Sequence, residues 1–321
     1  MKNGIPGPVG PGVFFWRRML RQSSVLALLA GAVLIGGCGG AADVVPPGGD
    51  SDAVPQRIVS LAPSLTETLF ALGLGDRVVG VTRFCAYPPE VLELPRVGGH
   101  LDPNFEAIVS LEPDLVLVIP SSRESGLRLE SLGISVLEVD QHDVEAVLES
   151  VSAVAAKCGV PDRGTVLREE LEGRLARVKA VVAEAPRPRA VVVVGHQTGG
   201  DTVRTVWAAG RDTFYDGVVQ IAGGVNAIEE GIARYPELSR EGLASLDADV
   251  VLDVIAGLEA RNLDPDELRA GWMQLTELRA VREHRVNVLS GDQMVVPGPR
   301  LPEMVEAMAR ALHPELDWGT E

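Results

Sequence analysis

The stretch from Asp162 to Ala185, DRGTVLREELEGRLARVKAVVAEA, decides the predicted fold. Its apolar residues recur at spacings of 4, 4, 3 and 4, which puts them on one face of a long helix. Pro186 and Pro188 follow and are expected to end the helix. The residues of the apolar face are Leu167, Leu171, Leu175, Val178 and Val182.

Strand and helix patterns alternate on both sides of this helix. The strands are almost entirely apolar, which is typical of parallel sheets covered on both faces. We therefore predict an α/β fold with two Rossmann-like lobes, joined by the single long helix and enclosing a ligand cleft. The expected domains are residues 56–160, 161–187 and 188–316. The expected strands are 57–61, 78–82, 114–119, 134–139, 189–194, 250–255 and 286–289; the expected helices begin at Ser64 (a capping box with Glu67), 105, 144 and 301.

The two halves share an internal repeat. The segment NFEAIVSLEPDLVL (104–117) aligns with SREGLASLDADVVL (239–252), and each reads as a short helix, a turn and a buried strand. The alignment gives Glu106 and Glu241 equivalent positions. The alternative is that helix–turn–strand units of any α/β protein look alike.

Residues 1–38 are interpreted as a lipoprotein signal peptide. Four basic residues precede an apolar run at 25–35, which is shorter than the ~20 residues of a membrane span. The run ends in LIGGCG, which resembles a lipobox with Cys38 as the lipidated residue. The alternatives are an ordinary signal peptide with a chance cysteine, and a start at Met19 instead of Met1. Residues 39–55 read as a flexible tether, so we expect an extracytoplasmic protein held to a membrane by lipid.

The composition excludes some classes of protein. The net charge of −16 becomes −20 when residues 1–37 are removed, which argues against a nucleic-acid binder. The three cysteines are widely separated and rule out a disulfide scaffold or a Cys-rich zinc site. Cys85 and Cys158 could pair in an oxidising compartment, although the position of one in a loop and of the other at a helix end disfavours a disulfide.

An ordered set of motifs resembles one family. IVSLAPS (58–64), ALGLGDRVVGV (71–81), YPPE (87–90), NFE (104–106) and PGPR (297–300) are similar to those of the cobalamin and iron-chelate substrate-binding proteins of ABC importers, most closely the cobalamin-binding members. The resemblance covers roughly residues 55–315. It implies a protein that captures a metal chelate outside the cytoplasmic membrane and delivers it to a permease dimer. No resident cofactor is implied, and a monomer is expected.

The resemblance also implies a docking role for Glu106 and Glu241, one on each lobe. In this family two glutamates pair with arginines of the two permease subunits, and carboxylate–arginine pairs are well suited to fixing orientation. The alternative is that each glutamate only complements the dipole of its own short helix.

The ligand site is predicted from aromatic, histidine and arginine residues. Aromatic side chains on predicted inter-lobe loops suit a broad, flat chelate. His100 and His196 can coordinate cobalt or iron or hydrogen-bond a ligand, although a structural role is commoner for a lone histidine. Arg83 and Arg300 can bind anionic groups or form surface salt bridges. The loop aromatics are Phe84, Tyr87, Trp207 and Tyr235, whereas Phe70, Phe105 and Trp272 are expected in the core.

Other functions remain as alternatives. The sequence contains no Gly-x-Ser-x-Gly elbow, phosphate loop or His-Glu-x-x-His motif, so no catalytic residue is assigned and an enzyme such as a hydrolase is disfavoured. Five scattered histidines disfavour a free-metal-ion receptor. A binding protein that feeds a sensor is a third alternative. Among transported ligands the resemblance, closest to cobalamin binders around the YPP motif at 87–89, implies a corrinoid before a ferric siderophore or haem.

Overall fold

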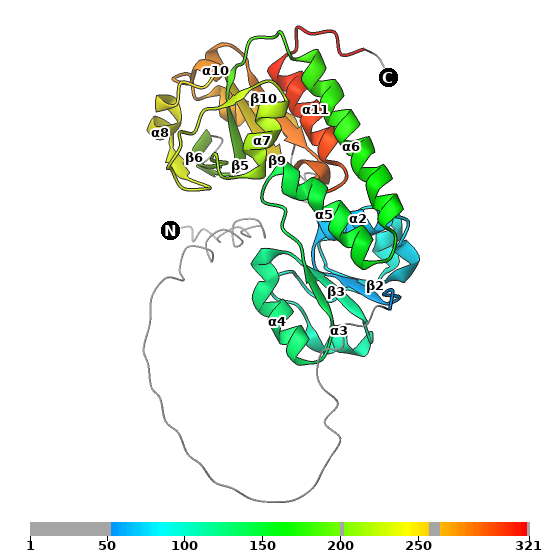
Figure 1. Ribbon diagram of the computed structural model, residues 1–321. Helices are drawn as coiled ribbons and strands as arrows, with labels where there is room; N and C mark the ends of the chain where they lie inside the picture. Colours follow the sequence, from blue (N-terminus) through cyan, green and yellow to red (C-terminus); the bar gives the residue numbers. More distant parts are fainter. Residues whose placement is uncertain (1–52, 200–201, 257–263, 320–321) are drawn as a thin grey trace, which may run out of the picture. The chain divides into compact units, whose positions relative to one another are not determined.

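The computed structural model describes residues 53–199, 202–256 and 264–319 (Figure 1). The predicted signal peptide with Cys38 and nearly all of the predicted tether lie outside the described residues. Within the described ranges, every helix is too short or too polar to cross a membrane.

The first sheet has four parallel strands in the order β2-β1-β3-β4. The side chains of β1, β2 and β3 are almost all buried, as the apolar runs predicted, whereas those of β4 at the edge are partly or fully exposed. The strands are β1 (Ile58–Ser60), β2 (Val78–Val81), β3 (Leu115–Val118) and β4 (Val136–Glu138); the helices are α2 (Pro63–Ala71), α3 (Phe105–Ser110), α4 (Arg123–Ser131) and α5 (Val144–Lys157).

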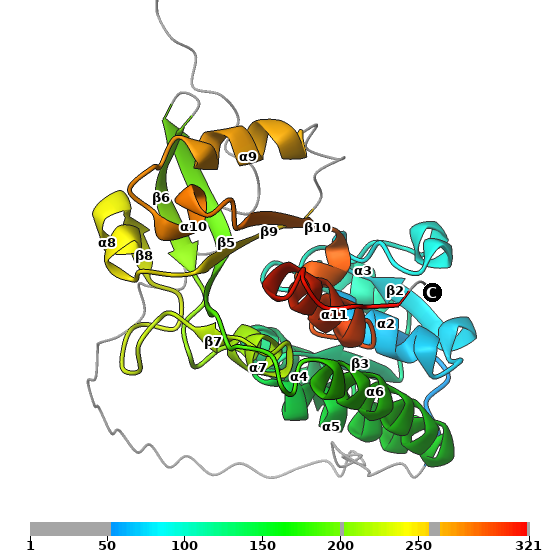
Figure 2. The ribbon, with the colours of Figure 1, turned by 90° about the horizontal axis from the view of Figure 1, so that it is seen from above.

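The second sheet contains four parallel strands with an antiparallel extension. The parallel strands follow the order β7-β5-β9-β10, and β6 and β8 continue the sheet from β5. Helices α9 and α10 lie on one side of this sheet and α7 and α11 on the other (Figure 2). The elements are β5 (Arg189–Gly199), β6 (Thr202–Ala208), α7 (Phe214–Ile221), β7 (Val225–Asn226), β8 (Glu237–Ser239), α8 (Arg240–Ser245), β9 (Val250–Ile255), α9 (Pro265–Met273), α10 (Arg279–Arg282), β10 (Val286–Ser290) and α11 (Leu301–Leu312).

The parallel parts of the two sheets repeat one topology. The order β2-β1-β3-β4 corresponds to β7-β5-β9-β10, with the same direction of every strand. The mixed α/β class with parallel sheets is therefore confirmed.

Equivalent side chains make equivalent hydrogen bonds in the repeat. Asp114 accepts the backbone N–H of Arg57 at 2.9 Å, and Asp249 accepts that of Arg189 at 2.8 Å. The two arginines donate to the carbonyl oxygens that end α3 and α8, at Leu111 and Leu246. In both units a residue just after the helix has a left-handed backbone conformation, with φ of 47° at Glu112 and 44° at Asp247. These contacts support a true internal repeat.

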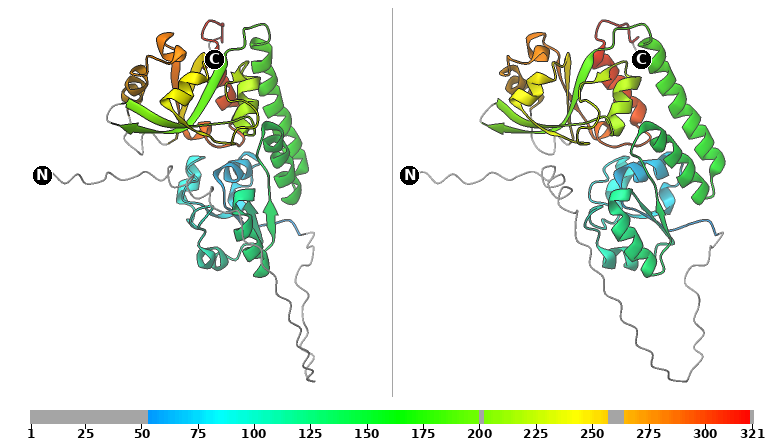
Figure 3. Two further views of the ribbon diagram at one scale, coloured as in Figure 1. Left: turned by 90° about the vertical axis from the view of Figure 1, so that its left-hand side faces the viewer. Right: turned by 60° about the vertical axis from the view of Figure 1, so that its left-hand side comes forward.

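Helix α6 (Pro161–Val181) is the long helix predicted from the sequence (Figure 3). It packs against α5 on the side of the first sheet and against α7 and α11 on the side of the second. The predicted apolar face is confirmed, because all five of its residues belong to or pack on the main core. The predicted end is wrong: the helix stops at Val181, four residues before Ala185, and the chain continues in turns in which the backbone N–H of Ala183 donates to Ala180 and that of Ala185 donates to Val182.

The predicted capping box at Ser64 is also wrong. Helix α2 begins earlier, with Ala62 at the N-cap and Pro63 in the first turn. The Ser64 hydroxyl instead donates to Gln141 at 2.6 Å, and the Glu67 carboxylate binds Arg300. Proline at the first helical position is pre-organised for a helix start and lacks one of the unsatisfied donors.

The buried state of the two cysteines leads to a first prediction. Cys85 and Cys158 are both free and buried, and burial raises the pKa of both thiols, that of Cys158 to about 11. Because the thiolate is the reactive form, we expect neither to react with a thiol reagent at pH 8 in the folded protein.

A Cys38→Ser variant removes the third thiol and makes the measurement unambiguous. Ellman's reagent should titrate no thiol in the native variant and two thiols in guanidinium chloride. Rapid labelling of the native variant would contradict the burial described here.

Candidate functional site

Three predicted site residues meet in the loops that follow β2. The Phe84 and His100 rings contact edge to face with centroids 6.1 Å apart, and the Arg83 guanidinium lies 4.8 Å from the Phe84 ring centroid. Arg83 also forms a salt bridge with Asp102 at 2.9 Å. Phe84 is 44% exposed, so this aromatic surface is available to a ligand. Burial lowers the pKa of His100, which favours its neutral, metal-coordinating form.

The backbone of these loops is held by short-range contacts. Arg96 donates to the carbonyl oxygens of Thr82 and Cys85 at 3.0 and 2.8 Å. Gly98 has φ of 94°, and a Cβ there would come within 2.8 Å of the Asn104 nitrogen. Only glycine fits this position. The turn at Gly98 lies against Asn104, the N-cap of α3, and His100 follows two residues later.

Tyr87 and Arg300 form a second group. Tyr87 is 46% exposed, and the Arg300 guanidinium lies 4.1 Å from its ring centroid. Nε and Nη2 of Arg300 donate hydrogen bonds to the Glu67 carboxylate, at 2.9 and 2.5 Å. The Arg300 and Glu67 side chains are only 13% and 3% exposed. Burial raises the pKa of Glu67, although hydrogen bonds and charge from Arg300 oppose this. Arg300 is therefore part of a buried ion pair and not of a surface salt bridge.

His196 has a buried environment in the second sheet. Its Nδ1 lies 3.4 Å from Asp253, and its ring packs edge to face on Trp272. Trp272 is fully buried, as predicted, and its indole N–H donates to Asp253 at 2.7 Å. The predicted strand ended at residue 194, but β5 continues to Gly199 and includes His196.

The remaining two aromatics have separate surroundings. Trp207 lies on β6 opposite Gly195, so its prediction as a loop residue is wrong. A Cβ at Gly195 would lie 3.6 Å from the Trp207 ring, an ordinary van der Waals contact, so this pairing does not depend on glycine. Tyr235 lies in a loop, as predicted, and packs against the main core. Burial raises the pKa of its hydroxyl to about 12. The contacts described above group Arg83, Phe84 and His100, and separately Tyr87 and Arg300, whereas His196 is grouped with Asp253 and Trp272.

Glu106 and Glu241 occupy the same position in the first turns of α3 and α8. Both are exposed, and the residue two positions earlier caps the helix in each case. Asn104 accepts the backbone N–H of Ala107 at 3.0 Å, and Ser239 accepts that of Gly242 at 3.2 Å. The equivalence predicted by the repeat is confirmed at the level of these capping contacts.

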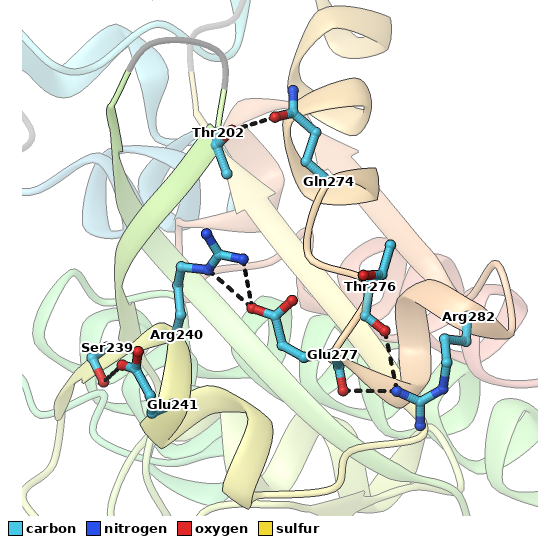
Figure 4. Close-up of polar contacts among 8 residues, drawn as sticks. All are labelled: Thr202, Ser239, Arg240, Glu241, Gln274, Thr276, Glu277 and Arg282. Carbon is cyan, nitrogen blue, oxygen red and sulfur yellow. Dashed lines mark hydrogen bonds and ion pairs between the residues drawn. The ribbon is translucent and has the colours of Figure 1, made fainter.

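The surroundings of the two glutamates differ. The Ser239 hydroxyl donates to Glu241 at 2.8 Å (Figure 4). The backbone N–H of Glu241 and then Ser239 hold the pKa of this carboxyl below its ordinary value. Beside it, Arg240 pairs with Glu277 at 2.7 Å. On α3 the residue equivalent to Arg240 is Phe105, which packs under Arg128 at 4.2 Å.

Three acidic residues of these groups were missed from the sequence. Asp102 and Glu67 pair with the predicted site arginines, and Asp253 joins His196 to Trp272. Asp253 carried a signal, because it is the one charged residue in the otherwise apolar run VVLDVI and a buried carboxylate needs partners. Glu67 carried a misleading signal, since its spacing from Ser64 matched a capping box.

Comparison with known proteins identifies the family. A family model described as periplasmic binding protein matches residues 58–292. The chain belongs to the periplasmic binding protein family. The resemblance inferred from the motifs is thereby confirmed.

Individual relatives fit this assignment. The chain is 30% identical to an uncharacterized ABC transporter substrate-binding lipoprotein, YvrC, of Bacillus subtilis, over 90% of this chain and 96% of the relative. It is 31% identical to a cobalamin-binding protein of Halobacterium salinarum, over 82% and 70%. The solved structure of the periplasmic heme-binding protein RhuT from Roseiflexus sp. RS-1 matches with a TM-score of 0.69 at 28% identity, covering 81% of this chain and 98% of that one. These relatives are named as binding proteins and not as enzymes.

The contact between Ser239 and Glu241 gives a second prediction. Replacement of Ser239 by Ala removes both the helix cap and the hydroxyl donor. We expect the free energy of unfolding to fall by about 1 kcal/mol, the usual effect of losing an N-cap. The pKa of Glu241 should rise towards its ordinary value, measured by NMR titration of its side-chain carboxyl carbon.

Ser245→Ala is the matched control, because this serine lies on the same helix and donates to Gly242 without touching Glu241. An unchanged Glu241 pKa in Ser239→Ala would show that the hydroxyl does not hold this carboxylate.

Proposed function

We propose that this substrate-binding protein captures a corrinoid outside the cytoplasmic membrane and delivers it to the permease of an ABC importer. The family and its relatives support the coarser assignment to the ABC-transporter substrate-binding proteins of the cobalamin, siderophore and haem class. In this proposal the two sheets are the cores of two lobes, α6 is their connecting helix, and the ligand binds between them.

The pairing of the arginines near the exposed aromatic residues favours a ligand with few anionic groups. Arg300 is neutralised by the buried Glu67, and Arg83 is paired with Asp102. An anionic ligand group would have to displace Glu67 from Arg300 and leave a buried carboxylate without its partner, a change that typically costs about 3–5 kcal/mol. A corrinoid carries neutral amides around most of its rim and makes no such demand. Haem propionates and siderophore carboxylates would have to compete with Glu67 for Arg300 or with Asp102 for Arg83.

The exposed aromatic surface supports the same ligand class. Phe84 and Tyr87 each leave nearly half of their surface uncovered, although aromatic side chains are usually buried. Their rings offer flat apolar area at a small cost in conformational entropy, which suits a macrocycle.

Haem is the second candidate, and a specific observation favours it. His100 lies against the exposed Phe84, and burial favours its neutral imidazole, which is the form that ligates iron. The structural similarity to a heme-binding protein adds weight to this alternative.

A ligand titration is the third prediction. Cyanocobalamin should bind the protein with 1:1 stoichiometry in isothermal calorimetry, and Tyr87→Ala should weaken binding by about 10-fold through lost ring contact. Leu132→Ala is a suitable control, because it removes another exposed apolar side chain on the far end of α4. Tight binding of haem with no binding of cyanocobalamin would replace the corrinoid proposal with the haem alternative.

Lipidation and permease docking complete the proposal. Cys38 would carry the lipid, and Glu106 and Glu241 would pair with arginines of the two permease subunits. Support comes from the equivalent, exposed positions of the two glutamates and from a relative named as a lipoprotein.

A docking experiment is the fourth prediction. The double variant Glu106→Ala and Glu241→Ala should bind ligand with wild-type affinity but reduce uptake by at least 10-fold, because each lost carboxylate–arginine pair contributes about 1.5–3 kcal/mol. Glu169→Ala with Glu170→Ala removes the same charge from the exposed side of α6 and should leave uptake unchanged. Normal uptake by the first variant would contradict docking through these residues.

A further inference from the structure

We propose that Glu67 is a positioning residue for the ligand site, acting on Tyr87 through the guanidinium of Arg300. The inference rests on the proposed function, because it assigns Tyr87 to the ligand-binding surface. It adds a role for a buried carboxylate that touches no ligand itself.

The three residues come from separate parts of the chain. Tyr87 lies in the loop after β2, Glu67 lies on α2, and Arg300 directly precedes α11. The segment before Arg300 packs tightly on the start of α2, since a Cβ on Gly298 would come within 3.3 Å of the Ser64 Cα. This close approach brings Arg300 to Glu67 and joins elements that flank different sheets.

The geometry fixes the plane of the guanidinium. Nε and Nη2 of Arg300 donate to the two different carboxylate oxygens of Glu67, at 2.9 and 2.5 Å. The guanidinium is planar by delocalisation, and a bidentate pair of this kind also restrains the turning of that plane about the Cδ–Nε bond. The Cζ atom of the same group lies over the Tyr87 ring, 4.1 Å from the ring centroid. The orientation of the exposed ring therefore follows from the orientation of Arg300.

Stability alone does not account for a charged pair at this place. A buried ion pair often stabilises a protein no more than apolar residues of the same volume, because both charges must be removed from water. Two further carboxylates, Glu303 and Asp292, oppose the ionised form of Glu67 electrostatically. The pair supplies a fixed planar surface of positive charge, which attracts the face of an aromatic ring.

A double-mutant cycle on ligand affinity tests the coupling. Glu67→Gln keeps the size of the side chain and removes its charge, so it should weaken cyanocobalamin binding about 10-fold in the wild-type background. In the Tyr87→Leu background the same substitution should have an effect of less than twofold, because there is no ring left to position. Equal effects of Glu67→Gln in both backgrounds would overturn the proposal.

A second readout needs no ligand. In protein labelled with 3-fluorotyrosine, the ¹⁹F resonance of Tyr87, assigned with Tyr87→Phe, should shift or broaden in Glu67→Gln. It should also do so in Arg300→Lys, which keeps the charge but loses the planar face. Glu303→Gln changes a nearby charge but keeps the pair between Arg300 and Glu67, and it should leave the resonance in place. An unchanged resonance in both test variants would overturn the proposal.

The two measurements separate this inference from the proposed function. If the wild-type protein does not bind cyanocobalamin, the corrinoid proposal fails, and the fluorine resonance still decides whether Glu67 positions Tyr87. Arg300→Lys serves as the deciding variant if Glu67→Gln does not fold, which circular dichroism would show.

Discussion

The burial of one apolar helix face is the constraint on which the rest of this structure depends. Leu171, Leu175 and Val178 of α6 belong to a core cluster that also contains side chains of both sheets. Because α5 packs on this helix from one side and α7 and α11 from the other, the two repeated units share one continuous apolar core. Each buried leucine or valine contributes about 1.5–3 kcal/mol through loss of water contact. The relative placement of the functional loops depends on this packing.

The internal repeat puts the two exposed glutamates at equivalent positions, and the residues around them differ. The arginine–aspartate contacts at the strand starts hold α3 and α8 in equivalent positions, so Glu106 and Glu241 must appear at matching sites. Their neighbours have diverged. Glu241 is held by Ser239 beside the Arg240–Glu277 pair, whereas α3 carries Phe105 under Arg128. A symmetric partner would therefore meet carboxylates at matching positions but with unlike surroundings.

Charges near the exposed aromatics are balanced within the protein. Arg83 and Arg300 have carboxylate partners, and Arg96 donates to backbone carbonyl oxygens. Each of these arginines is thus held by other groups of the protein. Cation–π contacts can have a structural role in such an arrangement. A guanidinium whose N–H groups are hydrogen-bonded to a carboxylate still has its face available to an aromatic ring.

Much of the fold followed from local patterns, because those patterns depend on neighbours in the chain. Apolar runs located every strand of the first sheet, periodicity gave the buried face of α6, and the repeat paired Glu106 with Glu241. The short strands β7 and β8 and the strand β6 were not predicted, and Trp207 was assigned to a loop, since antiparallel pairing with β5 decides that conformation.

The sequence by itself determined the α/β class, the repeat and the aromatic and acidic residues available for function. Only the tertiary structure decided the partners of the charged groups. Glu67 and Arg300 are 233 positions apart and meet because two distant segments pack together. A spacing rule cannot detect such a pair, because the distance between two side chains is set by the packing of the helices that carry them and not by their separation along the chain.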